Sequence, residues 1–432
     1  MSNTTELIHL IEQGSYDATF RKLYAQDEAT VLKQRARYTD AIAQFAKLYG
    51  AQRTVQLYSA PGRTEIGGNH TDHNNGVVMA AAVNIDIIAV ISQNSDFVVR
   101  VKSAGFDRQD CIDLTQLTPQ EKEKGRSGAL IRGVAADICT RGGKVGGFDA
   151  YTTSDVLRGS GLSSSAAFEV VIGAIFNGEY NHGKFSAVEI AQISQFAENE
   201  FFGKPSGLMD QTACSVGSAI TIDFKTPGAP IVTAVPFDLA KHGFALCITD
   251  TKGSHADLTD DYAAVRSEME SVAAFFGKKV LREVDEATFY TQIASVRAKT
   301  GDRAVLRAIH FFADCKRAAD LCKAVQEDRF DDFLQMIIEG GHSSFEYNQN
   351  AYSIKHPQEQ GVPIGVALSQ KVLHKNGAWR LQGGGFAGTI QAFVPQNLLA
   401  DYCAAMENVF GSDACHVLSV RNYGAIAVTQ TL

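Results

Sequence analysis

Apolar residues along this chain of 432 residues follow two different spacings. Apolar positions three and four residues apart predict amphipathic helices at 19–48, 128–139, 164–177, 187–201, 262–276, 304–325, 330–339 and 396–409. Runs rich in β-branched residues predict strands at 54–59, 77–83, 86–92, 98–101, 219–224, 231–235, 244–249, 389–393 and 425–429. The strands occur in clusters between helices rather than in strict alternation with them. This order favours an α+β fold of layered lobes over a doubly wound sheet.

The length of the chain exceeds what one hydrophobic core usually fills, which is about 250–300 residues. We therefore expect two domains, with residues 1–225 in the first and 226–432 in the second. No repeat, low-complexity tract or Gly/Ser linker marks the boundary between them.

The composition is that of an ordinary globular protein, with 45% hydrophobic and 20% charged residues. A net charge of −8 and the absence of a basic block argue against nucleic-acid partners. Residues 1–13 contain Glu6, His9 and Glu12 and do not resemble a signal peptide. The longest apolar stretch, 77–91, is interrupted by Asn84 and Asp86 and is too short to cross a bilayer. We expect a cytoplasmic protein without a membrane partner.

The eight cysteines are scattered and form no CxxC pair. In a chain of this size they predict reduced thiols rather than a disulfide framework or a zinc site.

The most informative glycine-rich segment is 159–167, which reads Gly-Ser-Gly-Leu-Ser-Ser-Ser-Ala-Ala. Its glycines allow close approach of the backbone to a ligand, and its hydroxyls can bond phosphate or a metal. The alanines that follow favour a helix, so phosphate would lie at a helix N-terminus. The candidate residues are Gly159, Gly161, Leu162, Ser163, Ser164, Ser165 and Ala166. A loop that ends in a serine N-cap is the simpler alternative, and the GxxxxGK[ST] pattern is absent.

An earlier polar segment, 59–74, contains Arg63, Glu65, His70, Asp72 and His73 in a turn-rich stretch. This mixture of donors and acceptors suits a polyhydroxylated ligand, because each sugar hydroxyl can both donate and accept a hydrogen bond. A metal bound by the closely spaced imidazoles and carboxylate is one alternative. A polar surface turn is another.

These two segments and a third, Gly-Gly-Gly-Phe-Ala-Gly at 383–388, resemble in order and spacing the three motifs of the GHMP family of small-molecule kinases. The first segment is similar to the galactokinase pattern GRxNLIGEHTDYxxG, and GLSSSAA stands unaltered at 161–167. Residues 198–201 and 207–211 look like the family's AEHxF and GIMDQ stretches. The resemblance covers residues from about 55 to 430.

The resemblance implies a two-lobed kinase with its active site in the cleft between the lobes, using ATP and Mg²⁺. It would phosphorylate the anomeric C1 hydroxyl of D-galactose to galactose 1-phosphate. Asp210 matches the catalytic carboxylate and Arg63 the arginine beside it. Without the resemblance, an aspartate at a helix start would more often be a cap.

The remaining roles are also carried over from the family. Magnesium would be held by a serine of 163–165, here assigned to Ser165, and by Glu198, with Glu200 as the second choice. Sugar contacts would come from Asn69, His70, Asp72, Gly207 and Tyr262.

Two departures from the pattern lie in the first segment, and the one at Asn69 could change the sugar. Asn69 stands where the family has glutamate, and Glu65 stands where it has asparagine. Because the family glutamate faces the C6 hydroxyl, an amide there leaves open a kinase for galacturonate or another C6-variant sugar. A non-catalytic sensor of galactose and ATP is a further alternative. We expect a monomer.

Overall fold

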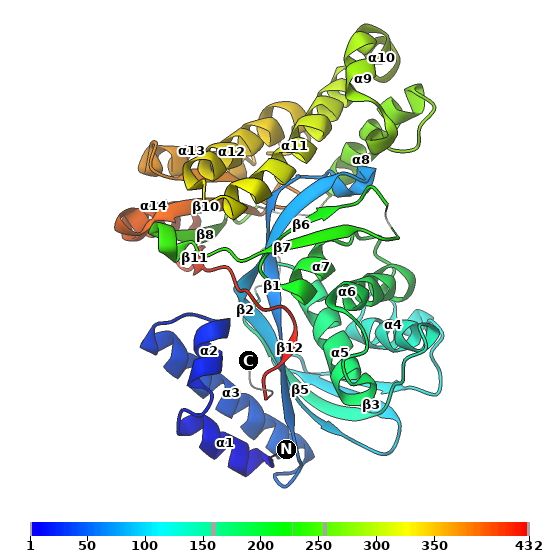
Figure 1. Cartoon of the computed structure of the whole chain (residues 1–432), viewed down its shortest axis with the longest axis vertical. Helices are drawn as coiled ribbons and strands as arrows, with labels where there is room; N and C mark the ends of the chain where they lie inside the picture. The colour runs from blue at the N-terminus through cyan, green and yellow to red at the C-terminus, as the bar shows by residue number, and fades with distance from the viewer. Residues whose placement is uncertain (1, 157–160, 227, 254–256, 430–432) are drawn as a thin grey trace.

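The computed structural model describes residues 2–156, 161–226, 228–253 and 257–429, and these residues form two sheets with helices around them (Figure 1). The larger sheet has eight strands in the order β12-β1-β2-β5-β3-β4, with β6 paired to β2 and β7 to β6. The smaller sheet has the order β11-β8-β10-β9. The strands are β1 (Gln56–Gly67), β2 (Val77–Gln93), β3 (Val98–Ser103), β4 (Gln109–Asp113), β5 (Phe148–Ser154), β6 (Ala219–Asp223), β7 (Ile231–Val235), β8 (Phe244–Asp250), β9 (Ala378–Leu381), β10 (Thr389–Pro395), β11 (Cys415–Leu418) and β12 (Ile426–Ala427). The predicted α+β class is confirmed.

The helices form three groups around the sheets (Figure 1). Helices α1 (Thr4–Glu12), α2 (Asp17–Leu23) and α3 (Glu28–Tyr49) pack at one end of the larger sheet. Its other side carries α4 (Ser127–Thr140), α5 (Ser164–Asn181), α6 (Ala187–Phe196) and α7 (Met209–Val216). The last group is α8 (Thr259–Phe275), α9 (Glu286–Thr291), α10 (Ile293–Thr300), α11 (Asp302–Gln326), α12 (Phe330–Ser343), α13 (Gly361–Leu373) and α14 (Leu399–Phe410).

Most of the predicted helices are confirmed, but two of them were predicted to be longer than the helices in the structure. The predicted helix 19–48 is divided, because Asp27 caps α3 by accepting a hydrogen bond of 2.8 Å from the backbone N–H of Thr30. The predicted helix 187–201 ends as α6 at Phe196 and continues as a π-helical turn, Ala197–Phe202. Glu198 lies in that turn.

Strand β2 is one continuous strand, whereas the sequence predicted two strands, 77–83 and 86–92, separated at residues 84–85. Its first half pairs with β6 and its second half with β5, while β1 pairs along both. The Asn84 side chain donates to the Tyr24 carbonyl and accepts from the Ser419 N–H, both at 2.9 Å. The polar residues therefore bind distant segments and do not mark a turn.

The larger sheet also contains strands from beyond the predicted boundary at 225. Strand β7 pairs with β6, and β12 near the C-terminus pairs with β1. The division at 225 stays a prediction, and the sheet itself continues past it.

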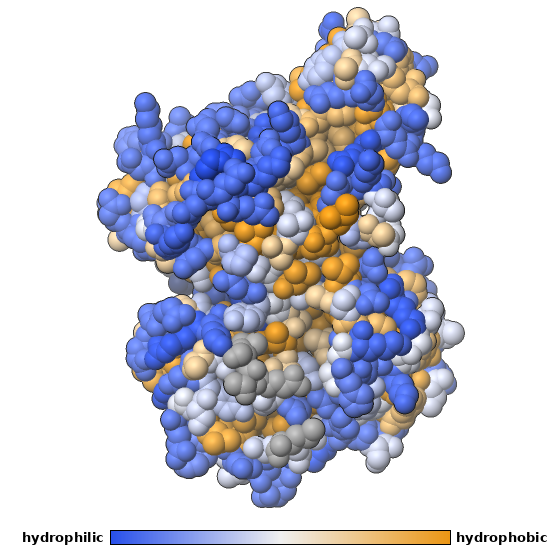
Figure 2. All heavy atoms as spheres, in the orientation of Figure 1, coloured by the Kyte–Doolittle hydropathy of each residue, from blue (hydrophilic) through white to orange (hydrophobic). Residues whose placement is uncertain are grey.

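Hydrophilic side chains cover most of the face shown in Figure 2, and apolar residues gather where its upper and lower parts meet. Among the described residues, no helix is both long enough and apolar enough to cross a bilayer.

Asp86 ties the N-terminal helices and the C-terminal segment to the larger sheet. Its fully buried carboxylate accepts from Arg37 at 2.6 Å, Tyr24 at 2.6 Å and Arg421 at 3.0 Å, and also from the Ser59 hydroxyl. Arg421 is itself fully buried. Loss of this carboxylate removes the ion pair of buried Arg421, whereas Arg37 keeps a second ion pair with Asp155 at 3.4 Å.

We expect Asp86→Asn to lower the free energy of unfolding by about 3–5 kcal/mol, because removing one partner of a buried ion pair leaves the other charge unpaired. Urea denaturation followed by circular dichroism measures the change. Lys241→Gln is the control, since its ion pair with Asp328 has side chains 63% and 62% exposed, and the expected loss is below about 1 kcal/mol. Equal losses in the two variants would contradict this account of Asp86.

Candidate active site

A cleft of about 1470 Å³ lies where residues 161–165, here called the serine loop, meet α7 and β11. Residues 415–418 of β11 line it, so both sheets contribute to its walls. Its lining includes Arg63, Gly161, Ser163, Ser164, Ser165, Lys204 and Asp210. The predicted catalytic pair and the predicted phosphate loop therefore face the same space.

Arg63 on β1 and Asp210 in the first turn of α7 form a two-pronged ion pair. Arg63 Nε lies 2.7 Å from Asp210 Oδ1, and a terminal nitrogen of Arg63 lies 2.8 Å from Oδ2. The second terminal nitrogen of Arg63 donates to the Gly161 carbonyl. The arginine thus joins β1, the serine loop and α7.

The electrostatic surroundings keep Asp210 ionised. Burial favours a raised pKa, but the Arg63 charge and the hydrogen bonds from Arg63 and Ser163 outweigh it and hold the Asp210 pKa below its ordinary value. The carboxylate side chain is 32% exposed, whereas that of Arg63 is only 8% exposed. A carboxylate with a lowered pKa is a weak base, but it can accept and orient a substrate hydroxyl.

The N-terminus of α5 receives no side-chain cap from the serine loop. Ser163 occupies the N-cap position in the left-handed region, with φ at 60°, and its hydroxyl donates to Asp210 instead of capping the helix. The helix dipole and the uncapped N–H groups therefore favour an anion at this end. Gly161 has φ at +68°, which favours glycine there.

The other loop residues have different environments. Leu162 and Ala166 are buried, and the Leu162 carbonyl accepts from the Arg63 backbone N–H at 3.1 Å. These two residues support the loop with their side chains. Gly159 lies outside the described residues.

Ser165 and Glu198, the predicted magnesium ligands, lie side by side. The Ser165 hydroxyl is 3.3 Å from Glu198 Oε1, and Lys204 Nζ donates to the same oxygen at 2.8 Å. A hydroxyl and a carboxylate are oxygen donors of the type Mg²⁺ prefers, so the pair fits this ion, which would compete with Lys204 for Glu198.

Sequence reasoning missed Glu169, Lys204 and Gln211. Gln211 Nε2 donates to Glu198 at 2.8 Å and to Glu169 at 3.1 Å, linking two buried carboxylates. Burial and the neighbouring Glu198 raise the pKa of Glu169 well above its ordinary value, and one of its oxygens has no partner. Glu169 follows Ser165 by four residues, a spacing that places both on one face of α5 and could have revealed it.

Of the predicted sugar contacts, His70 and Tyr262 both bind segment 383–388, and Asp72 and Gly207 lie against each other. His70 Nε2 donates to the Gly384 carbonyl at 2.9 Å, and the Tyr262 hydroxyl donates to the Gly385 carbonyl at 3.0 Å. The polar segment 59–74 and the glycine-rich segment 383–388 therefore meet. Gly207 lies against Asp72, since a Cβ at 207 would be 2.3 Å from Asp72 Oδ2. Among the described residues, the lining of the large cleft includes none of these four.

Two family models match the chain. The galactokinase galactose-binding signature matches residues 43–93, and the N-terminal domain of GHMP kinases matches residues 129–218. A galactokinase of Actinobacillus pleuropneumoniae is 35% identical over 361 residues, which cover 82% of this chain and 89% of that protein. The chain belongs to the galactokinase family.

Other members of the galactokinase family are also similar to it. A galactokinase of Streptomyces coelicolor is 31% identical over 85% of this chain and 92% of its own length. The crystal structure of Lactococcus lactis galactokinase complexed with galactose has a TM-score of 0.77, 21% identity, and coverage of 90% of this chain and 99% of that one. At that identity the likeness shows a shared fold, and it confirms the two-lobed GHMP-kinase architecture.

Compared with the galactokinase pattern, the carboxylate stands at Glu65 instead of at position 69. The amide stands at Asn69 instead of at position 65. The structure places the two side chains in contact, with Asn69 Nδ2 donating to Glu65 Oε1 at 2.9 Å. Arg380, which is 1% exposed, donates to the same oxygen at 2.9 Å. Burial raises the pKa of Glu65 to about 7, although Arg380 and Asn69 partly oppose this.

The Asn69 side chain is fully buried, and all its hydrogen-bonding atoms have partners in the protein. Its amide also donates to the Gly383 carbonyl at 2.7 Å, and its oxygen accepts from Asn350 at 2.8 Å. Contact with a sugar at Asn69, as predicted, would require some of these bonds to be exchanged. Positions 65 and 69 together still hold one carboxylate and one amide, and the two side chains are in contact.

The catalytic assignment predicts the behaviour of Asp210→Asn. Asparagine has nearly the same shape but accepts a proton poorly, so we expect kcat to fall by about 10²-fold or more, with the fold retained. Steady-state kinetics and thermal unfolding measure the two effects. Asp302→Asn is the control, because Asp302 also begins a helix but has a side chain 68% exposed. Near-normal turnover of the Asp210 variant would remove this residue from the chemistry.

The Glu65–Asn69 contact predicts non-additive effects on stability. Glu65→Asn leaves buried Arg380 without its carboxylate, which costs about 3–5 kcal/mol, and Asn69→Glu puts a second carboxylate beside Glu65. We expect the double exchange to be less destabilised than the sum of the single changes by at least about 1 kcal/mol. Denaturation of the unmodified protein, the two single variants and the double variant measures this difference. Simple additivity would show that the two positions act separately.

Proposed function

We propose that this protein transfers the γ-phosphoryl group of ATP to the C1 hydroxyl of galactose, forming galactose 1-phosphate and ADP. The single observation that supports the chemistry best is the Arg63–Asp210 pair beside the open N-terminus of α5. Phosphoryl transfer depends on a positioned nucleophile and on stabilisation of phosphate charge, and this arrangement offers both within one cleft.

The nucleotide would lie in the cleft with its phosphates at the serine loop. Gly159, Gly161, Leu162, Ser163, Ser164, Ser165 and Ala166 would form the loop around the phosphates. Besides Arg63, the cationic residues that line the cleft are Lys33, Arg108, Arg126 and Lys204. Their charges complement a triphosphate, and Lys204 lies nearest to the predicted magnesium ligands. Ser165 and Glu198 would hold Mg²⁺, which would neutralise phosphate charge when bound.

Asp210 would accept a hydrogen bond from the C1 hydroxyl and receive its proton as transfer proceeds. The bond from O1 to the γ-phosphorus forms while the bond to the bridging oxygen of ADP breaks, so ADP leaves with that oxygen. Arg63 would keep Asp210 ionised and face the phosphoryl oxygens. The ring hydroxyls would be held by His70, Asp72, Tyr262 and the backbone at Gly207, with Asn69 behind them.

The deciding experiment follows ADP release with ATP, Mg²⁺ and a panel of sugars that includes galactose, glucose, galacturonate and 1-deoxygalactose. We expect galactose to have the highest kcat/KM, and ³¹P NMR to show a C1 phosphate. The analogue 1-deoxygalactose is the matched control, because it keeps every other hydroxyl of galactose and lacks only the attacking one.

Phosphate at another carbon, or equal ADP release with 1-deoxygalactose, would refute the proposal. Binding of galactose and ATP without any turnover would identify a sensor instead.

A further inference from the structure

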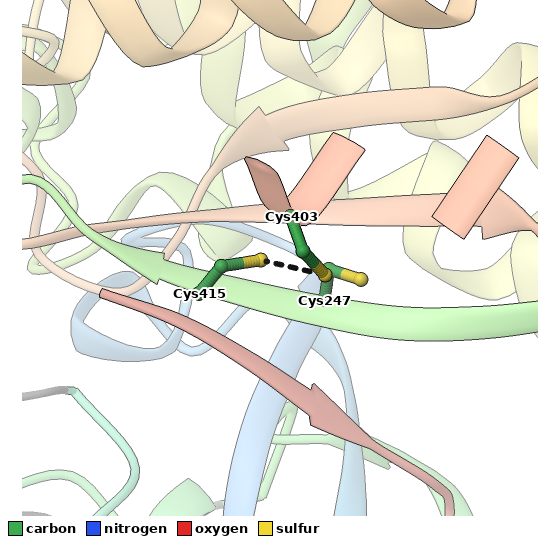
Figure 3. A group of neighbouring side chains, drawn as sticks. All are labelled: Cys247, Cys403 and Cys415. Carbon is green, nitrogen blue, oxygen red and sulfur yellow. Dashed lines mark hydrogen bonds between the residues drawn. The ribbon is translucent and has the colours of Figure 1, made fainter. Parts of the chain in front are cut away.

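Three cysteines distant in sequence meet beside the smaller sheet (Figure 3). Cys247 lies on β8, Cys415 on β11 and Cys403 on α14, and their sulfur atoms all lie within 4.8 Å of one another. The sulfur atoms of Cys403 and Cys415 are 3.7 Å apart. All three residues are free thiols.

We propose that Cys247, Cys403 and Cys415 form a binding site for a thiophilic divalent cation of the zinc and cadmium class. Zn²⁺ binds thiolate sulfur at about 2.3 Å in tetrahedral geometry, which places any two of the sulfur ligands about 3.8 Å apart. The Cys403–Cys415 separation of 3.7 Å is close to this value, and the sulfur of Cys247 lies within 4.8 Å of both. Soft thiolates select such cations over magnesium.

A fourth donor is available next to the three sulfurs. Thr249 is the strand partner of Cys415 and lies two residues after Cys247, so it shares their face of the sheet. Thr249 is fully buried, and its hydroxyl lies beside Cys415 and Tyr402 without a hydrogen bond of ordinary geometry. A buried hydroxyl without such a bond is costly, and a cation or its bound water would satisfy it.

The surroundings of the site are apolar, but the site is not closed. Cys247 and Cys415 belong to the hydrophobic cluster that contains Leu381, Tyr402 and Met406. In such surroundings three uncompensated thiolates are unfavourable, whereas a dication reduces their summed charge to −1. Cys403 is half-buried and Cys415 lines the large cleft, so an ion can enter from either side.

The sequence argued against zinc because no two cysteines have ligand spacing. The three cysteines stand at positions 247, 403 and 415. Only the pairing of β8 with β11 and the packing of α14 bring them together. The proposal is independent of the sugar-kinase function, since none of its residues belongs to the catalytic pair or the serine loop.

The test is a titration of the reduced full-length protein with Cd²⁺, followed by the ultraviolet thiolate-to-metal charge-transfer absorption. We expect one strongly bound ion per chain, for which Zn²⁺ competes only when it is in excess, because the softer Cd²⁺ binds thiolates more tightly. The variants Cys247→Ser, Cys403→Ser and Cys415→Ser should each weaken Cd²⁺ binding at least tenfold and reduce the absorption. Cys139→Ser is the control, because Cys139 is an exposed thiol outside the cluster and its loss should change nothing.

Thermal unfolding of the unmodified protein gives a second readout that needs no variant. Zn²⁺ should raise the melting temperature, with a shift that keeps growing as the Zn²⁺ concentration exceeds Kd, and a chelator should reverse it. Absence of charge-transfer absorption would overturn the proposal. So would binding that survives all three cluster variants, or that is lost in Cys139→Ser.

Discussion

The buried contact between Arg63 and Asp210 determines the arrangement of the candidate active site. One guanidinium binds a carboxylate 147 positions away along the chain and a carbonyl 98 positions away. A planar guanidinium can serve both because it presents several N–H donors in fixed directions. The same contact keeps Asp210 ionised and draws Ser163 toward it, which leaves the N-terminus of α5 without a side-chain cap. The anion binding proposed at α5 and the hydroxyl binding proposed at Asp210 therefore both depend on one residue of β1.

The exchange of Glu65 and Asn69 shows that a buried site constrains the sum of its groups more than the position of each. Arg380 is buried and needs a carboxylate nearby, and the backbone carbonyl of Gly383 needs a donor. Either order of carboxylate and amide can meet these needs if the two side chains touch. A substitution that looks like a change of substrate in a motif can therefore be one half of a compensated pair.

Polar residues inside apolar segments were the main source of error in the sequence-based prediction. A break at residues 84–85 was expected between strands 77–83 and 86–92, yet β2 passes through it, because the partners of Asn84 and Asp86 come from α3, β1 and residues 419–421. Strand β5 was not predicted, and it contains Asp149, which pairs with Arg53 at 3.0 Å and Arg100 at 3.2 Å. A buried charge is tolerated when a counter-charge meets it, and local periodicity carries no information about that partner.

The sequence by itself determined the α+β class, many of the helices and the family, and it predicted which residues would form the catalytic pair and the serine loop. These features are local or are recorded in ordered motifs, so the spacing of a few residues was sufficient. Only the tertiary structure decided that the Ser163 hydroxyl binds Asp210. It alone showed that Gln211 links Glu198 to Glu169. The enclosure of Asn69 by Glu65, Gly383 and Asn350 was likewise visible only in the structure. The tertiary structure also decided that three scattered cysteines share one site. Each of these depends on which elements pack together, because hydrogen bonds and metal ligands act over about 2–4 Å in space, whatever the separation along the chain.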